Sequence, residues 1–219
     1  MDHNPSSALP PAIHQPITDH TTLVAFFDQV APWQKIQWGT QRVVELLARV
    51  DHPERGCRYV IVGGTNAKGS TSLYLAALLQ ACGLSVGVTV SPHISDIRER
   101  IQIQGRFITQ DELIAVMETI RQALLDWPLD RLELPTYHEV WTVAALLAFH
   151  RAGCEWAVLE VGMGGRYDAV RAVAAEAAVL CPVSFDHMQY LGDTLAAIAG
   201  EKVEIFPPGK LVVTAKQHP

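Results

Sequence analysis

The residues best suited to chemistry lie in the segment "GGTNAKGST", residues 63–71, between a short apolar run and a helical pattern. Small residues after a strand let consecutive backbone amides point at a phosphate, and the start of a helix adds partial positive charge. Lys68 would neutralise phosphate charge, and Ser70 or Thr71 could reach a magnesium ion. The usual pattern has glycine before the lysine, where this chain has Ala67, which is strained there if its φ is positive. The context favours a nucleotide-binding loop; an ordinary glycine-rich turn is the alternative.

A second candidate is the segment "WAVLEVGMGGRYDA", residues 156–169. Its apolar strand ends in Glu160, which places a carboxylate at the carboxyl edge of the sheet, where open α/β sheets bind ligands. Mg²⁺ prefers such oxygen ligands. The glycines do not form a dinucleotide fingerprint, because Tyr167 stands where the third glycine is needed. The alternative role for Glu160 is to cap the turn that follows its own strand.

A third candidate follows the next apolar strand, where Asp186 and His187 should emerge at the same edge. A lone histidine is usually structural. This one is of interest because Glu201 and Lys202 lie on a short helix that begins just behind it, at "GDT".

The composition indicates a globular protein with a substantial core. The chain has 219 residues, of which 49% are hydrophobic and 18% charged, a length that suits one domain. A net charge of -6 gives no basic footprint, so we expect no nucleic-acid partner. No apolar run reaches the ~20 residues that cross a bilayer, and no secretion signal is evident. We therefore expect no membrane partner. Four cysteines without CxxC pairing fit reduced thiols, so we expect a cytoplasmic protein.

The elements that must position these residues alternate short β-branched runs with longer helical patterns, which predicts an α/β fold with a mostly parallel sheet flanked by helices. The expected strands are 59–62, 85–90, 156–161, 178–183 and 211–214. The expected helices are 68–82, 110–126, 137–152 and 194–206, with covering helices in 21–30 and 40–50. Capping boxes, Thr109 with Glu112 and Thr136 with Glu139, mark two of the starts. Residues 100–109 predict a small hairpin that hangs off the main sheet, and residues 1–20 a disordered tail.

Five segments in order resemble the folylpolyglutamate synthase/dihydrofolate synthase family of the Mur ligase superfamily, over roughly residues 36–219. They are "GGTNAKGST", "VSPHISDIRERIQIQG", "EVGMGGRYDA", "FDHMQYLGDTLAAIAGEK" and "PPGK". The resemblance implies a P-loop-type, Mur-ligase ATP-binding domain over residues 21–219. It also implies an ATP-dependent amide ligase, in which ATP phosphorylates a folate or dihydropteroate carboxylate and the amine of L-glutamate attacks the acyl phosphate.

The resemblance also assigns roles to residues. The catalytic residues would be Lys68, His187 and Lys202. Ser91 and Glu160 would hold one Mg²⁺, and His187 a second together with Lys202 as a carbamate, which replaces a repelling ammonium with anionic oxygens. The ATP loop would comprise Gly64, Thr65, Asn66, Ala67, Lys68, Gly69, Ser70 and Thr71. The substrate residues would be Pro92, His93, Arg98, Arg100, Arg166 and Asp168.

The chain departs from the family pattern at Ala67, at "YDAVRA", at "EKVEI", and at "TYHEV", where the family is rich in phenylalanine. It stops directly after a predicted strand, so we expect an incomplete ATP-binding domain without the C-terminal glutamate-ligase domain, inactive by itself. The small-molecule substrates would then be its partners, and we expect a monomer. A degenerate, non-catalytic nucleotide- or folate-binding homologue is one alternative. Another P-loop enzyme, such as a small-molecule kinase, is disfavoured because His187 and Lys202 would have no role there.

Overall fold

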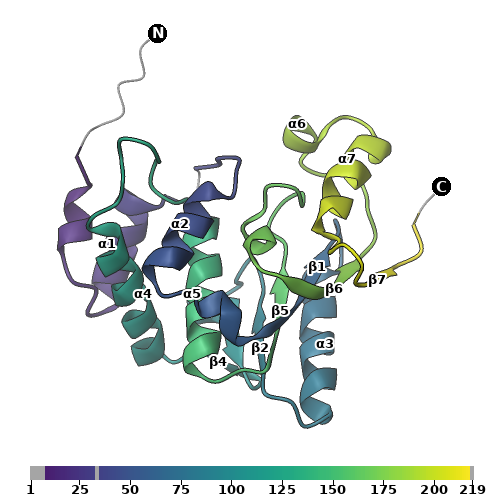
Figure 1. Ribbon diagram of the computed structural model, residues 1–219, viewed down its shortest axis with the longest axis horizontal. Helices are drawn as coiled ribbons and strands as arrows, with labels where there is room; N and C mark the ends of the chain where they lie inside the picture. Colours follow the sequence, from purple (N-terminus) through teal and green to yellow (C-terminus); the bar gives the residue numbers. More distant parts are fainter. Residues whose placement is uncertain (1–7, 33–34, 218–219) are drawn as a thin grey trace.

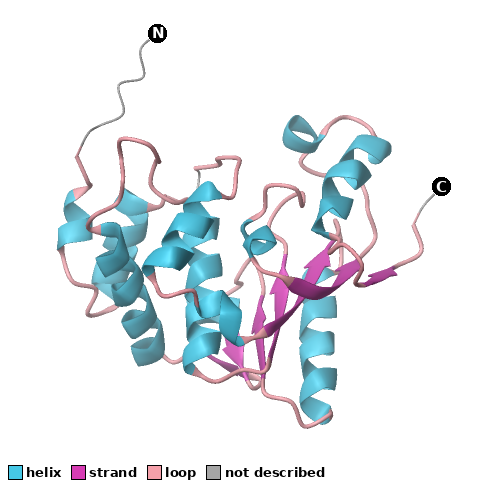
Figure 2. Cartoon of the chain, in the orientation of Figure 1, coloured by secondary structure: helices cyan, strands magenta, loops and turns pink. Residues whose placement is uncertain are grey.

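The computed structural model describes residues 8–32 and 35–217 of the chain. Seven strands form one sheet in the order β4-β3-β2-β5-β1-β6-β7 (Figures 1 and 2). The strands are β1 Arg58–Gly63, β2 Val86–Thr89, β3 Ile101–Ile103, β4 Arg106–Phe107, β5 Trp156–Glu160, β6 Ala175–Leu180 and β7 Leu211–Thr214. Strands β2, β5, β1, β6 and β7 pair in parallel, whereas β3 and β4 are antiparallel. The predicted α/β class with a mostly parallel sheet is confirmed.

Helices cover both faces of this sheet. The α-helices are α1 His20–Val30, α2 Gln41–Arg49, α3 Lys68–Ala81, α4 Gln110–Leu124, α5 Tyr137–Arg151, α6 Met188–Leu191 and α7 Leu195–Lys202. The 3-10 helices are η1 Pro11–His14, η2 Pro53–Gly56, η3 Ile97–Arg100, η4 Ala169–Ala172 and η5 Val203–Ile205. Figure 1 shows α1, α2, α4 and α5 on one side of the sheet and α3 on the other. The central strand β1 is therefore buried on both faces, which explains its continuous apolar run.

Helix α5 is the element that the larger core surrounds. Residues 139–149 of this helix are all buried, so it is apolar on every side rather than along one stripe. Its Phe149 ring lies against Gly87 of β2, where an added Cβ would come within 2.3 Å of the ring. The absence of a side chain at Gly87 therefore lets α5 pack directly on the sheet. That packing places the N-terminus of α5 at the carboxyl edge of the strands.

Three expectations need correction. The hairpin does not hang off the sheet: β3 pairs with β2, so β3 and β4 form the edge of the main sheet. The strand expected over 178–183 runs from Ala175 to Leu180 instead, since Pro182 has no N–H for a ladder. The helix expected over 194–206 is α-helical only to Lys202 and continues as η5.

The fourth correction concerns the expected tail, of which residues 1–7 lie outside the described part. The remainder, 8–20, is ordered. Ile13 and Ile17 are buried, the amide of Ile17 donates to Glu118 (2.8 Å), and Arg121 donates to the carbonyl of Ile13 (2.6 Å). Two apolar side chains and a buried arginine on α4 thus hold a segment that is rich in proline.

Candidate nucleotide and substrate site

The loop between β1 and α3 has a backbone that only small residues fit. Gly64 has φ +135°, and a Cβ there would lie 2.7 Å from the Cβ of Cys181. Ala67 adopts the left-handed conformation, with φ 64° and ψ 11°, so the strain expected from the sequence is present. Ala67 is also the N-cap of α3, and a helix start leaves its first amides without intrahelical acceptors. The amides of 67–70 are therefore the donors that the start of α3 can offer to an anion.

The loop is anchored on the segment that follows β6. The amides of Thr65 and Asn66 donate to the carbonyl of Pro182, at 2.9 and 3.3 Å. The Thr65 hydroxyl donates to the carbonyl of Ser184 and accepts from its amide, both at 3.0 Å. The Thr71 hydroxyl accepts from the thiol of Cys181 at 3.3 Å, whereas Ser70 is exposed. Of the two hydroxyls proposed for a cation, Ser70 is therefore the accessible one.

Two lysines lie close to this loop. Lys68 bends back so that Nζ donates to the carbonyl of Thr65 (3.3 Å), and buried Lys202 donates to the carbonyl of Gly64 (3.0 Å). Lys202 reaches the loop because α7 packs directly on Gly165, where a Cβ would lie 2.5 Å from the carbonyl of Glu201. Burial and then the charge of Lys68 lower the pKa of Lys202 to about 8. Neither ammonium forms an ion pair with a described carboxylate, so an anion would be stabilised between them.

Glu160 supplies negative charge next to these amines. It is 5% exposed and accepts from the amide of Ser91 at 2.7 Å. A Cβ at Gly69 would lie 3.5 Å from the Glu160 carboxylate, which places this carboxylate against the first turn of α3. Burial raises the pKa of Glu160, although the Ser91 amide and Lys68 work in the opposite direction. The Glu160 carboxylate accepts its hydrogen bond from Ser91, just after the neighbouring strand β2. The structure therefore does not support the alternative that Glu160 caps the turn after β5.

A buried carboxylate with no ion-pair partner in the described chain fits a divalent cation with oxygen ligands. Glu160 would hold such a cation with Ser91, as proposed from the sequence. The residues proposed for a second Mg²⁺, His187 and Lys202, are not brought together to the same extent. His187 is 44% exposed and lies 3.5 Å from Asp186, while Lys202 is engaged at Gly64. The described residues contain no group of three or more His, Cys, Asp or Glu side chains that could hold a metal ion.

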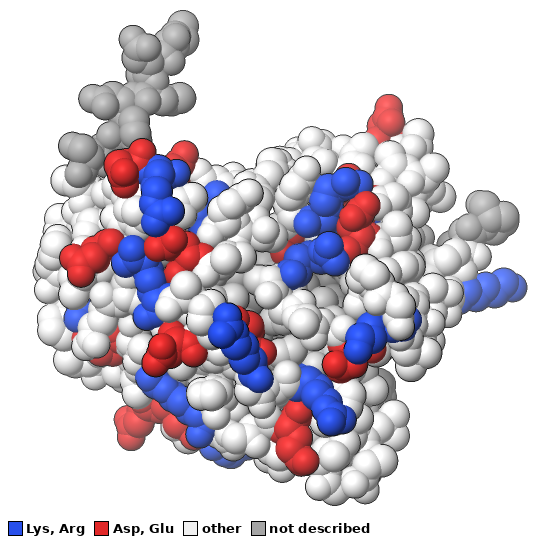
Figure 3. Space-filling model, in the orientation of Figure 1, with Lys and Arg blue, Asp and Glu red and all other residues white. Residues whose placement is uncertain are grey.

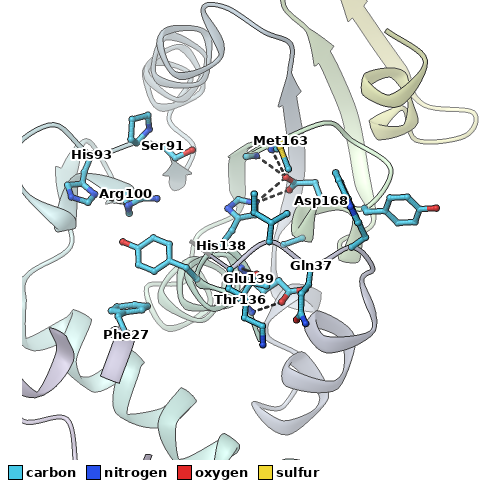
Figure 4. A pocket seen from close by; sticks show the side chains of 18 of the residues that line it. Phe27, Gln37, Ser91, His93, Arg100, Thr136, His138, Glu139, Met163 and Asp168 are labelled. Carbon is cyan, nitrogen blue, oxygen red and sulfur yellow. Dashed lines mark hydrogen bonds and ion pairs between the residues drawn. The ribbon is translucent and has the colours of Figure 1, made fainter. Parts of the chain in front are cut away.

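A pocket of about 720 Å³ is lined in part by Ser91, whose amide donates to Glu160, and its walls come from segments distant in the sequence (Figure 4). Aromatic and apolar side chains form much of it, among them Phe27, Ile36, Trp38, Pro92, Tyr137, Met163 and Tyr167. The predicted residues Ser91, Pro92, His93, Arg100, Asp168 and His187 all line it. Apolar walls with a few convergent polar groups are typical of sites for small molecules.

Two cations line this pocket in the described chain, Arg100 and Lys35, and Lys35 pairs with Glu133. The Arg100 guanidinium lies over the rings of Tyr137 and Trp141, at 5.2 and 5.7 Å, and Nε donates to Nδ1 of His93 at 2.9 Å. No described carboxylate pairs with it, so it could receive one from a ligand. Arg98 and Arg166 are not brought to the pocket. Arg98 pairs with Asp96, while Arg166 pairs with Glu201 and Glu204.

Sequence reasoning missed the side chains at the start of α5. His138 lies 3.1 Å from both carboxylate oxygens of Asp168, and buried Glu139 forms a two-pronged ion pair with buried Arg42, both bonds at 2.9 Å. Glu139 also accepts from the amide of Thr136, as the capping box predicted. The departure of "TYHEV" from the family pattern was the only sequence signal for His138. Nothing in the sequence pointed to Arg42, because its partner lies 97 residues away.

Charge elsewhere is dispersed. On the face shown in Figure 3, Lys and Arg side chains lie beside Asp and Glu side chains rather than in one patch. In the described part of the chain, no helix has the length and apolarity required to span a membrane.

Comparison with known proteins agrees with this geometry. Residues 62–216 match the Mur ligase middle domain. The dihydrofolate synthase/folylpolyglutamate synthase of Bacillus subtilis is 37% identical over 186 residues, which cover 83% of this chain and 42% of that protein. A solved structure described as Escherichia coli FolC in complex with DHPP and ADP superposes with a TM-score of 0.82 at 31% identity, over 93% of this chain and 47% of that one.

A third relative is a bifunctional folylpolyglutamate synthase/dihydrofolate synthase solved with Mn, AMPPNP and L-glutamate bound. Its TM-score is 0.79 at 31% identity, with 93% of this chain and 47% of that one covered. The chain thus spans less than half the length of these three relatives. The chain belongs to the Mur ligase family and is similar to folylpolyglutamate synthases/dihydrofolate synthases.

Proposed function

We propose that this chain is the ATP-binding part of a ligase that joins L-glutamate to a folate or dihydropteroate carboxylate. The single observation that carries the proposal is the convergence of Lys68, Lys202 and Glu160 on the loop before α3 and the first turn of that helix. Two amines without ion-pair partners among the described residues and one buried carboxylate suit a nucleotide phosphate with its cation. The relatives solved with ADP or AMPPNP support the choice of nucleotide.

In this proposal the amides of 67–70 and Lys68 hold the β- and γ-phosphates of ATP. A carboxylate oxygen of the acceptor substrate attacks the γ-phosphorus, so that ADP leaves and an acyl phosphate forms. The amine of L-glutamate then attacks the acyl carbon, phosphate departs, and a proton is released from the new amide nitrogen. Preorganised positive charge around the transferring group would be the main contribution of this chain to the rate.

Magnesium would be held by Glu160 and Ser91 and would neutralise charge on the phosphates. A second site would use His187 with carbamylated Lys202. The pKa of about 8 for Lys202 supports this modification, because a larger fraction of the amine is neutral and able to add to the carbon of CO₂ with loss of a proton. A carbamate would then give the chain a second anionic group beside the loop.

The pocket would hold the acceptor substrate. Its aromatic walls suit a flat ring system, and Arg100 with His93 suits an anionic carboxylate. The matched relatives are about twice as long, so this proposal gives the chain only the nucleotide and acceptor share of the reaction, with the glutamate-ligase domain outside it. We propose a monomer whose partners are these small molecules.

The test is binding and turnover with separate readouts. Binding of a fluorescent ADP analogue to the 219-residue chain should require Mg²⁺ and should be about tenfold or more weaker in Lys68→Met. In the full-length gene product, phosphate release should require both dihydropteroate or tetrahydrofolate and L-glutamate. Release that does not depend on a folate-type acceptor would refute the ligase. Nucleotide binding with no phosphate release would favour the non-catalytic homologue, the alternative suggested by strained Ala67.

A further inference from the structure

One end of the pocket is formed by Asp168, whose carboxylate is already fully engaged. Oδ2 accepts from the amides of Gly162 and Met163, at 2.9 and 3.0 Å, and Oδ1 accepts from the amide of Val170 at 3.1 Å. His138 lies 3.1 Å from both oxygens, and the Asp168 side chain is 2% exposed (Figure 4). A carboxylate has about four acceptor positions, and here the protein occupies them. Asp168 thus has no accessible oxygen for a ligand.

His138 covers Asp168 on the pocket side. An ionised carboxylate only accepts hydrogen bonds, so Nε2 of His138 must carry the proton between them. Nδ1 forms no hydrogen bond within the described chain and is not buried, and 36% of the side chain is exposed. The ring lies against Gly162, where a Cβ would come within 2.7 Å of Cε1, so a larger residue would displace it. The ring is therefore fixed, with Nδ1 accessible.

The surrounding charges decide whether Nδ1 carries a proton. Burial disfavours the imidazolium, but the charge and hydrogen bond of Asp168, with a smaller effect of Glu139, outweigh burial and the repulsion by Arg100. The pKa of His138 is therefore raised above its ordinary value. The charge of His138 also interacts with that of Glu160. The raised pKa favours the imidazolium form of His138, whose Nδ1–H is a donor.

We propose that His138 is the specificity-determining residue at this end of the pocket, donating Nδ1–H to an acceptor atom, a carbonyl oxygen or ring nitrogen, of the substrate's ring system. This inference rests on the proposed function, and it replaces the direct role in substrate binding that the sequence suggested for Asp168. Asp168 becomes a positioning residue that orients and charges His138. Trp38 and Tyr167, whose rings meet edge to face at 5.8 Å, line the same pocket and offer aromatic surface to a flat ligand.

The experiment measures binding of dihydropteroate to the 219-residue chain by calorimetry between pH 5.5 and 8.5. We expect the wild-type affinity to fall about tenfold as His138 loses its proton, because a hydrogen bond from a charged donor is replaced by two facing acceptors. His138→Gln, which keeps a neutral donor, should bind with little dependence on pH. His138→Phe should bind about tenfold more weakly at pH 6. His150→Gln, at the exposed far end of the same helix, is the matched control and should follow the wild type.

Binding of the fluorescent ADP analogue, unchanged in each variant, shows that the fold and the loop are intact. Equal or tighter dihydropteroate binding by His138→Phe would mean that Asp168 itself binds the ligand when His138 no longer covers it, and would overturn the inference. A pH profile of His138→Gln that matches the wild type would overturn it as well. These outcomes leave the proposed function standing. If the wild type binds the ADP analogue but neither dihydropteroate nor tetrahydrofolate, the proposed substrate and the role of His138 both fail.

Discussion

Replacement of Ala67 by glycine should stabilise this protein. Ala67 has φ 64° and ψ 11°, a left-handed conformation that costs an L-residue roughly 1–2 kcal/mol and glycine almost nothing. Glycine also makes the unfolded chain more flexible, which lowers the free energy of unfolding by about 0.4–1 kcal/mol and offsets part of this gain. The net expectation for Ala67→Gly is an increase of about 0.5–1 kcal/mol in the free energy of unfolding. For a chain of this size, each kcal/mol of added stability raises the melting temperature by roughly 2–4 °C.

The matched control is Ala77→Gly in the same helix. Ala77 is exposed and lies in right-handed helix, so glycine there should lower the free energy of unfolding by about 1 kcal/mol. Urea unfolding of both variants should therefore give changes of opposite sign. We also expect ADP affinity to stay within about twofold in Ala67→Gly, because glycine readily adopts the same left-handed backbone and the methyl group that is removed offers phosphate no hydrogen bond. A loss of stability as large as that of Ala77→Gly would refute the left-handed assignment.

Three further outcomes follow from the structure. Gly87→Val should lower the free energy of unfolding by about 1–3 kcal/mol in urea, since a Cβ there lies 2.3 Å from the Phe149 ring; an unchanged midpoint would contradict this packing. Lys68→Met should weaken ADP binding about tenfold or more, because a positive charge is lost from the phosphate site; equal affinity would remove Lys68 from that site. The melting temperature should stay unchanged, since among the described residues the amine bonds only the Thr65 carbonyl, at 3.3 Å. Burial opposes ionisation of Asp168, but His138 and backbone amides outweigh it and hold the pKa of this carboxyl below the ordinary value. The ionised carboxylate therefore stabilises the fold above the unfolded pKa of about 4, and this stabilisation is lost as the pH falls through the folded pKa. Asp168→Asn should therefore flatten the acid limb of the stability curve, and an unchanged limb would show that another carboxylate controls it.

The candidate site combines local signals with partners that are far apart in the chain. The loop of 63–71 could be located from the sequence because strand, small residues and helix follow one another directly. Glu160 and Lys202 could be proposed only through strand ends and the family resemblance. Their actual partners, the Ser91 amide and the Gly64 carbonyl, lie 69 and 138 residues away. Arg98 and Arg166 were plausible substrate ligands by type, yet nearby acidic residues neutralise both.

The sequence by itself determined the elements. Strand and helix periodicities, together with the capping boxes at Thr109 and Thr136, gave the correct helix starts and the α/β class, because these signals act within one turn or one strand. Only the tertiary structure decided that β3 and β4 extend the main sheet and that His138 covers Asp168. Both depend on which distant segments the core brings into contact, and burial then fixes hydrogen bonds and charge states that no short stretch of sequence encodes.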